Sequence, residues 1–238
     1  ESKQPWVALP PGVPAVAAFY DRPSTWPAES LARLAALRKA RSGAPAVVAL
    51  QPRDLGEVVE VLGEAFQDYP VMRHVLGPVH DYDACLPILV TLFASGRSLR
   101  GEPMLGVRGA DGRLLAVALV TPPISVAAPA ELLALRARTW ERLGADAKQR
   151  YEAFADACNR LGIDTPHHHL NMIGVRRAHQ GSGLARRLLE AVHELARNDP
   201  HSAGVSLTTE HAPNLALYQR FGYRVTGELQ VAADLRTW

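Results

Sequence analysis

The segment from Ile173 to Ala185 combines residue types that can bind a phosphate-bearing ligand. Gly181 and Gly183 stand directly before an apolar-periodic stretch that predicts a helix. Glycine lets the backbone approach a ligand closely, and the unpaired N–H groups at a helix N-terminus favour an anion. A glycine-rich connection without a ligand is the alternative, because isolated glycine motifs are weak signals. A Walker loop is excluded since no Gly-Lys-Ser/Thr follows, and the glycine spacing fits a Rossmann loop poorly.

Three consecutive histidines, His167–His169, raise the question of metal or acid–base chemistry. Adjacent strand residues point to opposite faces, and no nearby Asp, Glu or Cys completes a ligand set, so we expect no metal. Strand alternation predicts one face with four members: His169, Asn171, Ile173 and Val175. Because imidazole titrates near neutrality, His169 is a candidate base, and a histidine that only lines a cleft is the alternative. Glu210, at the end of the next expected strand, is the rival base.

The elements that position these residues mix helices and strands, which predicts an α/β (α+β) fold. We expect strands at 46–50, 101–108, 113–121, 169–175, 205–209 and 223–231, the first of them buried. We expect helices at 27–41, 54–66, 129–143, 146–161, 184–197 and 213–221. Asp54 and Glu57 have the spacing of a capping box at a helix start. Asp111-Gly112 is a strong hairpin signal between the second and third strands.

Two of these stretches resemble signatures of the GNAT superfamily of N-acetyltransferases. Gln180-x-x-Gly183-x-Ala185 resembles the acyl-CoA pyrophosphate loop, and the segment 214–223 resembles the second signature. The resemblance covers about residues 46–238. It implies a mixed, mostly antiparallel central sheet, splayed at the acetyl-CoA site and flanked by helices, with acetyl-CoA as cosubstrate.

A closer resemblance, to the puromycin N-acetyltransferase family, lies in the stretches 65–74, 208–214 and 235–238. The helical insertion at 129–161 sits where that family has one, and we expect it to border the acceptor pocket. This resemblance implies that the acceptor is a small-molecule amine, with an antibiotic among the candidates. A protein N-terminus or lysine remains an alternative acceptor. A non-catalytic acyl-CoA-binding regulatory module is the alternative from another class.

The GNAT resemblance implies direct attack of the amine on acetyl-CoA and roles for particular residues. Tyr218 would be the acid for the leaving thiolate, although a packed core aromatic is the alternative, and Asn214 shares its helix face. Backbone amides at 173–175 would hold pantetheine and the developing oxyanion. The expected acetyl-CoA-binding residues are Ile173, Gly174, Val175, Gln180, Gly181, Ser182, Gly183, Leu184, Ala185, Asn214 and Tyr218. The expected acceptor-binding residues are Asp68, Tyr69 and His74.

The amino-acid composition narrows the possible classes of protein. The 238 residues are 47% hydrophobic and 21% charged, with a net charge of +2, and no basic cluster indicates a nucleic-acid partner. No run of about 18 apolar residues predicts a membrane span, and no signal peptide is evident, so we expect a cytoplasmic protein. Cys85 and Cys158 are expected to be free thiols. We expect one domain at 46–238 with the Pro-rich extension 1–45 packed on it, and we leave a homodimer open.

Overall fold

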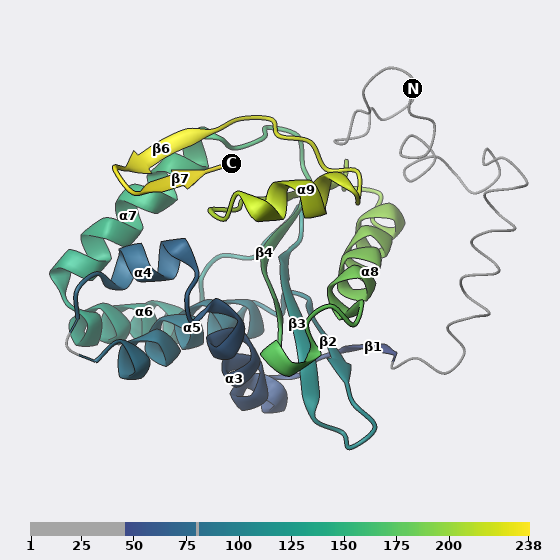
Figure 1. Cartoon of the computed structure of the whole chain (residues 1–238), viewed down its shortest axis with the longest axis horizontal. Helices are drawn as coiled ribbons and strands as arrows, with labels where there is room; N and C mark the ends of the chain where they lie inside the picture. Colours follow the sequence, from purple (N-terminus) through teal and green to yellow (C-terminus); the bar gives the residue numbers. More distant parts are fainter. Residues whose placement is uncertain (1–45, 80) are drawn as a thin grey trace, which may run out of the picture.

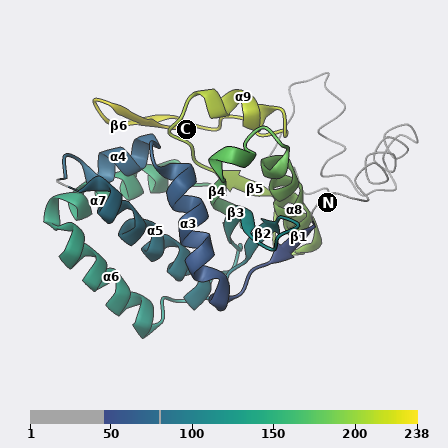
Figure 2. The ribbon, with the colours of Figure 1, turned by 60° about the horizontal axis from the view of Figure 1, so that its bottom comes forward.

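The computed structural model of the chain describes residues 46–79 and 81–238 (Figure 1). The expected extension 1–45, with its helix at 27–41, lies outside the described residues. The described part has the expected mixed fold, in which helices cover both faces of a central sheet (Figure 2). No helix within the described ranges combines the length and apolar character needed to cross a bilayer.

The central sheet has five strands in sequence order. They are β1 (Val47–Ala49), β2 (Met104–Arg108), β3 (Leu114–Thr121), β4 (His168–Val175) and β5 (Val205–Leu207). Neighbours pair antiparallel up to β4, whereas β4 and β5 pair parallel. The predicted hairpin is confirmed, with Gly112 at a φ of 80° in its turn. The first strand is not buried as expected, because β1 is the edge of the sheet and only Leu50 beyond it is buried.

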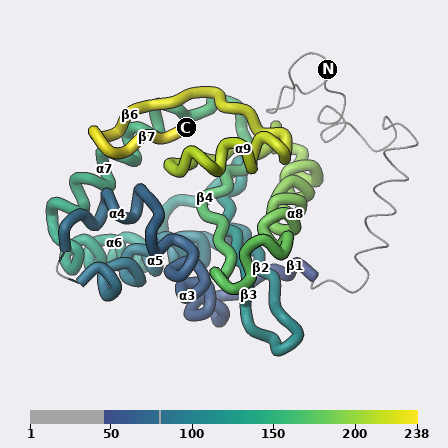
Figure 3. The backbone as a smooth tube through the Cα atoms, in the orientation of Figure 1, coloured from purple at the N-terminus to yellow at the C-terminus, as the bar shows by residue number. Residues whose placement is uncertain are grey.

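One face of the sheet is covered by α3 (Leu55–Phe66) and α5 (Tyr82–Leu99), and the other by α8 (Leu184–Asn198). The α3 side is extended by α4 (Pro70–Leu76), α6 (Ala130–Leu143) and α7 (Ala145–Arg160), so the insertion is two helices as predicted. The short helix α9 (Pro213–Gln219) lies across the end of the sheet near β4 and α8 (Figure 3). Sequence analysis did not anticipate α5, the longest helix of the described part.

Apolar side chains form two clusters, one on each face of the sheet. The first includes Leu62 of α3 and Leu89 of α5, and the second includes Leu188 and Val192 of α8. All four side chains are fully buried. The stripe predicted on 184–197 therefore faces the sheet, which fixes the start of α8 beside the end of β4.

The capping box expected at Asp54 and Glu57 is not the one that forms. A 3-10 turn, η2 (Pro52–Asp54), precedes α3, and Gln51 N–H donates to the Asp54 carboxylate over 2.7 Å. Arg108 in β2 forms ion pairs of 2.9 Å with Asp54 and 2.8 Å with Glu57. The two acids thus tie the start of α3 to the hairpin rather than capping the helix.

The prediction of a last strand over residues 223–231 is wrong in its position. The segment 223–228 has no regular structure, and β6 (Leu229–Ala232) pairs with β7 (Leu235–Thr237) as a separate hairpin. Thr209 and Trp238 exchange two backbone hydrogen bonds of 3.0 Å each. This pair joins the C-terminal hairpin to the end of β5 and places Thr237 beside Glu210.

Candidate active site

An extra residue in β4 changes which side of the sheet its side chains face. Leu119 of β3 pairs with Met172 and Val120 pairs with Leu170, so Asn171 has no partner on β3. Leu170 packs in the α8 cluster, whereas Met172 packs in the α3 cluster. A regular strand would put residues two apart on the same side. The expectation that His169, Ile173 and Val175 share one face is therefore wrong, because a bulge at Asn171 lies between them.

Within the described part of the chain, the C-terminal half of β4 has no neighbouring strand on the β5 side. Pairing of β4 with β5 runs only from His168 to Leu170, so residues 172–175 have β3 alone as a sheet partner. Arg176 N–H donates to the carbonyl of Leu115 over 2.9 Å. Antiparallel alternation then directs the N–H groups of Ile173 and Val175 away from β3, toward the gap. Two of the three residues predicted to offer backbone contacts thus direct their N–H groups into this gap.

Gly174, the third, serves packing. Its backbone alternates with Ile173 and Val175 and so faces Val117 of β3. A Cβ at Gly174 would lie 2.8 Å from Ala65 Cβ and 3.0 Å from a methyl of Leu62, both on α3. Glycine here lets α3 lie close against the sheet.

The glycine-rich loop forms the expected turn into α8. A short 3-10 helix, η3 (Arg177–His179), precedes it, and Gly181 and Gly183 have φ values of 77° and 83°. The first helical bond is Arg187 N–H to Gly183 O, so the preceding amides of the first turn have no helical partner. Gln180, Gly181, Ser182 and Gly183 are exposed, and space above both glycines is open. The loop therefore has the shape of an anion site.

Two arginines beside this loop form ion pairs with acidic residues of the protein itself. Arg176 binds the Leu114 carbonyl over 2.8 Å and pairs with Glu60 and Glu64 of α3, each over 3.1 Å. Arg177 pairs with Asp68 over 2.7 Å.

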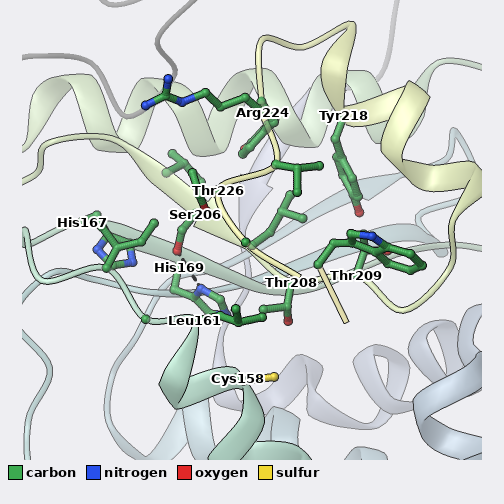
Figure 4. A pocket seen from close by; sticks show the side chains of 18 of the residues that line it. Cys158, Leu161, His167, His169, Ser206, Thr208, Thr209, Tyr218, Arg224 and Thr226 are labelled. Carbon is green, nitrogen blue, oxygen red and sulfur yellow. Dashed lines mark hydrogen bonds between the residues drawn. The ribbon is translucent and has the colours of Figure 1, made fainter. Parts of the chain in front are cut away.

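Two cavities meet at the gap between β4 and β5. The first, of about 350 Å³, is lined by β5, the segment 223–227 and residues after α7, and we call it the β5 cavity (Figure 4). The second, of about 340 Å³, is lined by β4, α4, α5 and α7, and we call it the α7 cavity. Six residues line both: Cys158, Asn159, His169, Leu207, Thr208 and Tyr218.

Tyr218 projects its hydroxyl into this junction (Figure 4). Its ring packs edge-on against Tyr223 at 5.7 Å, so the side chain is both a core aromatic and a cavity residue. Burial raises the pKa of Tyr218 well above its ordinary value, with smaller contributions from Tyr69 and Glu210. The phenol consequently carries its proton at neutral pH and can donate it.

Glu210 lines the α7 cavity with a carboxyl group that titrates near neutrality. Thr237 Oγ1 donates to Glu210 Oε1 over 2.8 Å, and the Glu210 N–H donates to the Tyr69 hydroxyl over 3.2 Å. Burial raises the pKa of Glu210 to about 7, against hydrogen bonds that lower it. A base in this range is half deprotonated at neutral pH and still basic enough to accept a proton.

His169 also lines both cavities, but burial acts on it in the opposite direction. Burial lowers the pKa of His169 to about 4, helped by His167 and Arg97. Its Nδ1 lies 2.8 Å from Ser206 Oγ, an interaction between β4 and β5. The imidazole is therefore neutral at pH 7 and a much weaker base than Glu210.

A hydrogen-bonded group links Glu210 to the second predicted signature. The Tyr69 hydroxyl lies 2.9 Å from Thr209 Oγ1, and Asn214 Nδ2 donates to the same oxygen over 3.3 Å. Tyr69 and Asn214 both line the α7 cavity. Thr209 was not among the expected site residues. The only sequence signal for its hydrogen bonds with Tyr69 and Asn214 was its position directly before Glu210.

The other expected acceptor residues lie elsewhere. Asp68 is exposed and pairs with Arg73 and Arg177, while His74 Nδ1 lies 3.7 Å from Asp234. Neither lines the β5 cavity or the α7 cavity, whereas Tyr69 lines the α7 cavity. From the insertion, α7 contributes Tyr151, Phe154 and Cys158 to the α7 cavity. Trp140 of α6 does not line the α7 cavity. Its ring packs against that of Tyr151, with the ring centroids 5.1 Å apart.

The three histidines have three separate environments. His167 Nδ1 lies 2.7 Å from the Thr165 carbonyl, and His168 Nδ1 lies 2.9 Å from Ser202 Oγ. Within 46–79 and 81–238, no group of three or more His, Cys, Asp and Glu side chains is placed to hold a metal ion.

Comparison with known proteins relates the fold and the C-terminal part of the chain to acetyltransferases. Residues 147–237 match the family model described as acetyltransferase (GNAT) domain. A solved structure described as histone acetyltransferase HPA2 and related acetyltransferase, from Corynebacterium glutamicum, is similar with a TM-score of 0.61 and 22% identity, over 82% of this chain and 94% of that one. Arylalkylamine N-acetyltransferase 2 from Aedes aegypti is similar with a TM-score of 0.56 and 16% identity, over 82% and 96%. The chain therefore has the GNAT fold, and its residues 147–237 match the GNAT acetyltransferase domain.

Proposed function

We propose that this enzyme transfers the acetyl group of acetyl-CoA to a primary amine of a small molecule. The observation that carries the proposal is the α7 cavity. A protonated phenol, Tyr218, and a carboxyl of pKa about 7, Glu210, both line it beside the gap between β4 and β5. That combination supplies an acid and a base to one reacting centre.

Acetyl-CoA would bind through backbone groups. The loop Gln180–Ala185 would hold the pyrophosphate at the N-terminus of α8. The amides of Ile173 and Val175 would bond pantetheine and the thioester carbonyl, where a fixed donor stabilises the oxyanion. Asn214 would contact the pantetheine arm, and the Gln180 side chain, bonded to the Val175 carbonyl over 3.3 Å, would keep loop and strand together.

The proton transfers follow from the two pKa values. The carboxylate of Glu210 takes a proton from the ammonium, directly or through water, and the neutral amine attacks the thioester carbonyl. As the tetrahedral adduct collapses, the carbon–sulfur bond breaks and Tyr218 protonates the leaving sulfur. The nitrogen of the adduct gives up its second proton, which restores the phenol of Tyr218, and Glu210 releases the first proton to solvent. This assigns the base to Glu210 rather than His169, which would line the cavity as a neutral residue.

The volume of the α7 cavity, about 340 Å³, and its lining by α4, α5 and α7 support a small acceptor over a protein N-terminus or lysine. The resemblance in 65–74, 208–214 and 235–238 makes puromycin and other amine antibiotics the first acceptors to test. A purely regulatory acyl-CoA-binding module would need neither Tyr218 nor a base at Glu210.

A screen of amines that follows thiol release from acetyl-CoA tests the proposal. We expect turnover with at least one small amine, and its loss in a Tyr218→Phe, Glu210→Gln double variant that still binds CoA. CoA binding without release for any amine or peptide would contradict the enzymatic proposal. Release with peptides alone would contradict the small-molecule acceptor.

A further inference from the structure

The α7 cavity contains two charged side chains among the described residues that line it, Arg97 and Glu210. They belong to different elements, α5 and the segment after β5, and they contact different groups. Glu210 lies beside Tyr69 and Thr237, whereas Arg97 contacts Thr121 of β3. An acceptor in this cavity therefore meets one acid and, on another wall, one permanent cation.

The charge of Arg97 is held in place by a carboxylate behind it. Arg97 Nε lies 2.8 Å from Glu102 Oε2, and the Glu102 side chain is only 3% exposed against 18% for Arg97. The second Glu102 oxygen accepts a hydrogen bond from Ser125 Oγ over 2.5 Å. Glu102 does not line the cavity, so this ion pair and this hydrogen bond form behind the cavity wall.

Aromatic and aliphatic side chains form one part of the lining of the α7 cavity. Phe93, Tyr151 and Phe154 come from α5 and α7, and Phe93 and Tyr151 lie 5.7 Å apart. Val75 and Leu89 continue the apolar wall. Such a wall stabilises an apolar body, whereas a second ammonium would lose its hydration there without a carboxylate to pair with. Attraction of the ammonium to an aromatic face offsets part of this lost hydration but supplies no counterion.

We propose that the acceptor is a monocationic amine with an aromatic-sized apolar body, and that Arg97 is the specificity-determining residue that excludes amines with a second cationic end. The inference rests on the proposed function, because it places the reacting amine at Glu210. An α,ω-diamine bound there extends its second ammonium along the aromatic wall toward Arg97. The like charge and the missing counterion both oppose binding.

A matched acceptor panel with the wild-type enzyme tests this. Phenethylamine and tryptamine are compared with 1,5-diaminopentane and agmatine by thiol release from acetyl-CoA. We expect kcat/KM for the aromatic monoamines to exceed that for the dications by about 100-fold or more. Equal or better turnover of the dications would overturn the inference and leave the proposed function intact. Absence of release with every amine would instead count against the proposed function.

Variants at the buried pair separate charge from space. Arg97→Gln removes the cation from the cavity wall and leaves the Glu102 carboxylate behind it without a counterion, so kcat/KM for the dications should rise by about 10-fold or more. The control is Arg97→Gln with Glu102→Gln, in which both charges are removed and the gain should be smaller. An equal gain in both variants would mean that space, not charge, sets the preference, and would overturn the role of Arg97. If the single variant does not fold, the wild-type panel alone decides.

Discussion

Replacing Glu210 by Gln should separate the catalytic and the structural effect of burying a carboxyl group. The substitution keeps the size of the side chain and a hydrogen-bond acceptor for Thr237, but removes the proton-accepting group. With a pKa of about 7, the wild-type carboxyl is ionised in about a tenth of molecules at pH 6 and about nine-tenths at pH 8. We expect kcat/KM of the wild type to rise about tenfold per pH unit below pH 7, and this limb to vanish in Glu210→Gln. The remaining rate should be lower by about 10²–10⁴.

The same substitution should stabilise the fold at high pH. Glu210 has a pKa raised from an ordinary 4.5 to about 7, so the folded state holds its proton more tightly than the unfolded state. The stability from the protonated form is present below pH 4.5 and is lost as the pH rises through 7. At pH 8 the wild type therefore carries a penalty of about 3 kcal/mol that Glu210→Gln lacks.

Urea unfolding at pH 5 and pH 8, with Glu141→Gln on the exposed face of α6 as the control, measures this difference. A pH–rate profile of His169→Gln completes the set and should keep the wild-type limb. The reasoning is refuted if the limb persists in Glu210→Gln and disappears in His169→Gln. It is also refuted if Glu210→Gln is no more stable than the wild type at pH 8.

Three other substitutions test the remaining parts of the site. Tyr218→Phe should retain CoA binding and lose about 10²–10⁴ in kcat, which rapid mixing under single-turnover conditions can confirm; a loss below tenfold would remove the acid role. Gly183→Val should weaken CoA binding by calorimetry, because a side chain at a φ of 83° strains the loop and fills the open space above it; unchanged affinity in a folded variant would contradict the anion site. Arg176→Gln should cost about 2 kcal/mol in urea unfolding and leave the KM for acetyl-CoA unchanged, since its partners are Leu114, Glu60 and Glu64; a raised KM alone would make it a phosphate ligand.

The parts of the fold that local sequence determines were predicted well. Asp111-Gly112 fixed the hairpin, the stripe Leu184, Leu188 and Val192 fixed α8, and the paired glycines fixed the loop before it. Each of these signals depends on residues close together in the chain. The acidic pair Asp54 and Glu57 misled because their partner, Arg108, is about fifty residues away.

The choice of base could not be made from the sequence because it depends on tertiary burial. An exposed Glu titrates near 4.3 and an exposed His near 6.5, which favours histidine as a base at neutral pH. Burial reverses the order, raising the pKa of Glu210 and lowering that of His169. The bulge at Asn171 could not be predicted either, since no residue type in the segment 168–175 indicates an unpaired position. Because the sequence analysis assumed a regular strand without this bulge, it placed His169 on the wrong side of the sheet.

Because of the gap beside β4, ligand binding can be followed by hydrogen exchange, without an activity assay. Amides of Ile173 and Val175 lie within a strand, yet they face the gap and not β3 or β5. In the free enzyme their deuterium uptake should be fast, while the amides of Met172 and Gly174, which face β3, should exchange slowly. Acetyl-CoA should slow uptake at the first pair and leave the second unchanged. Residue-resolved exchange along this one strand would thus show an alternating pattern that disappears on binding, independently of turnover and of the acceptor.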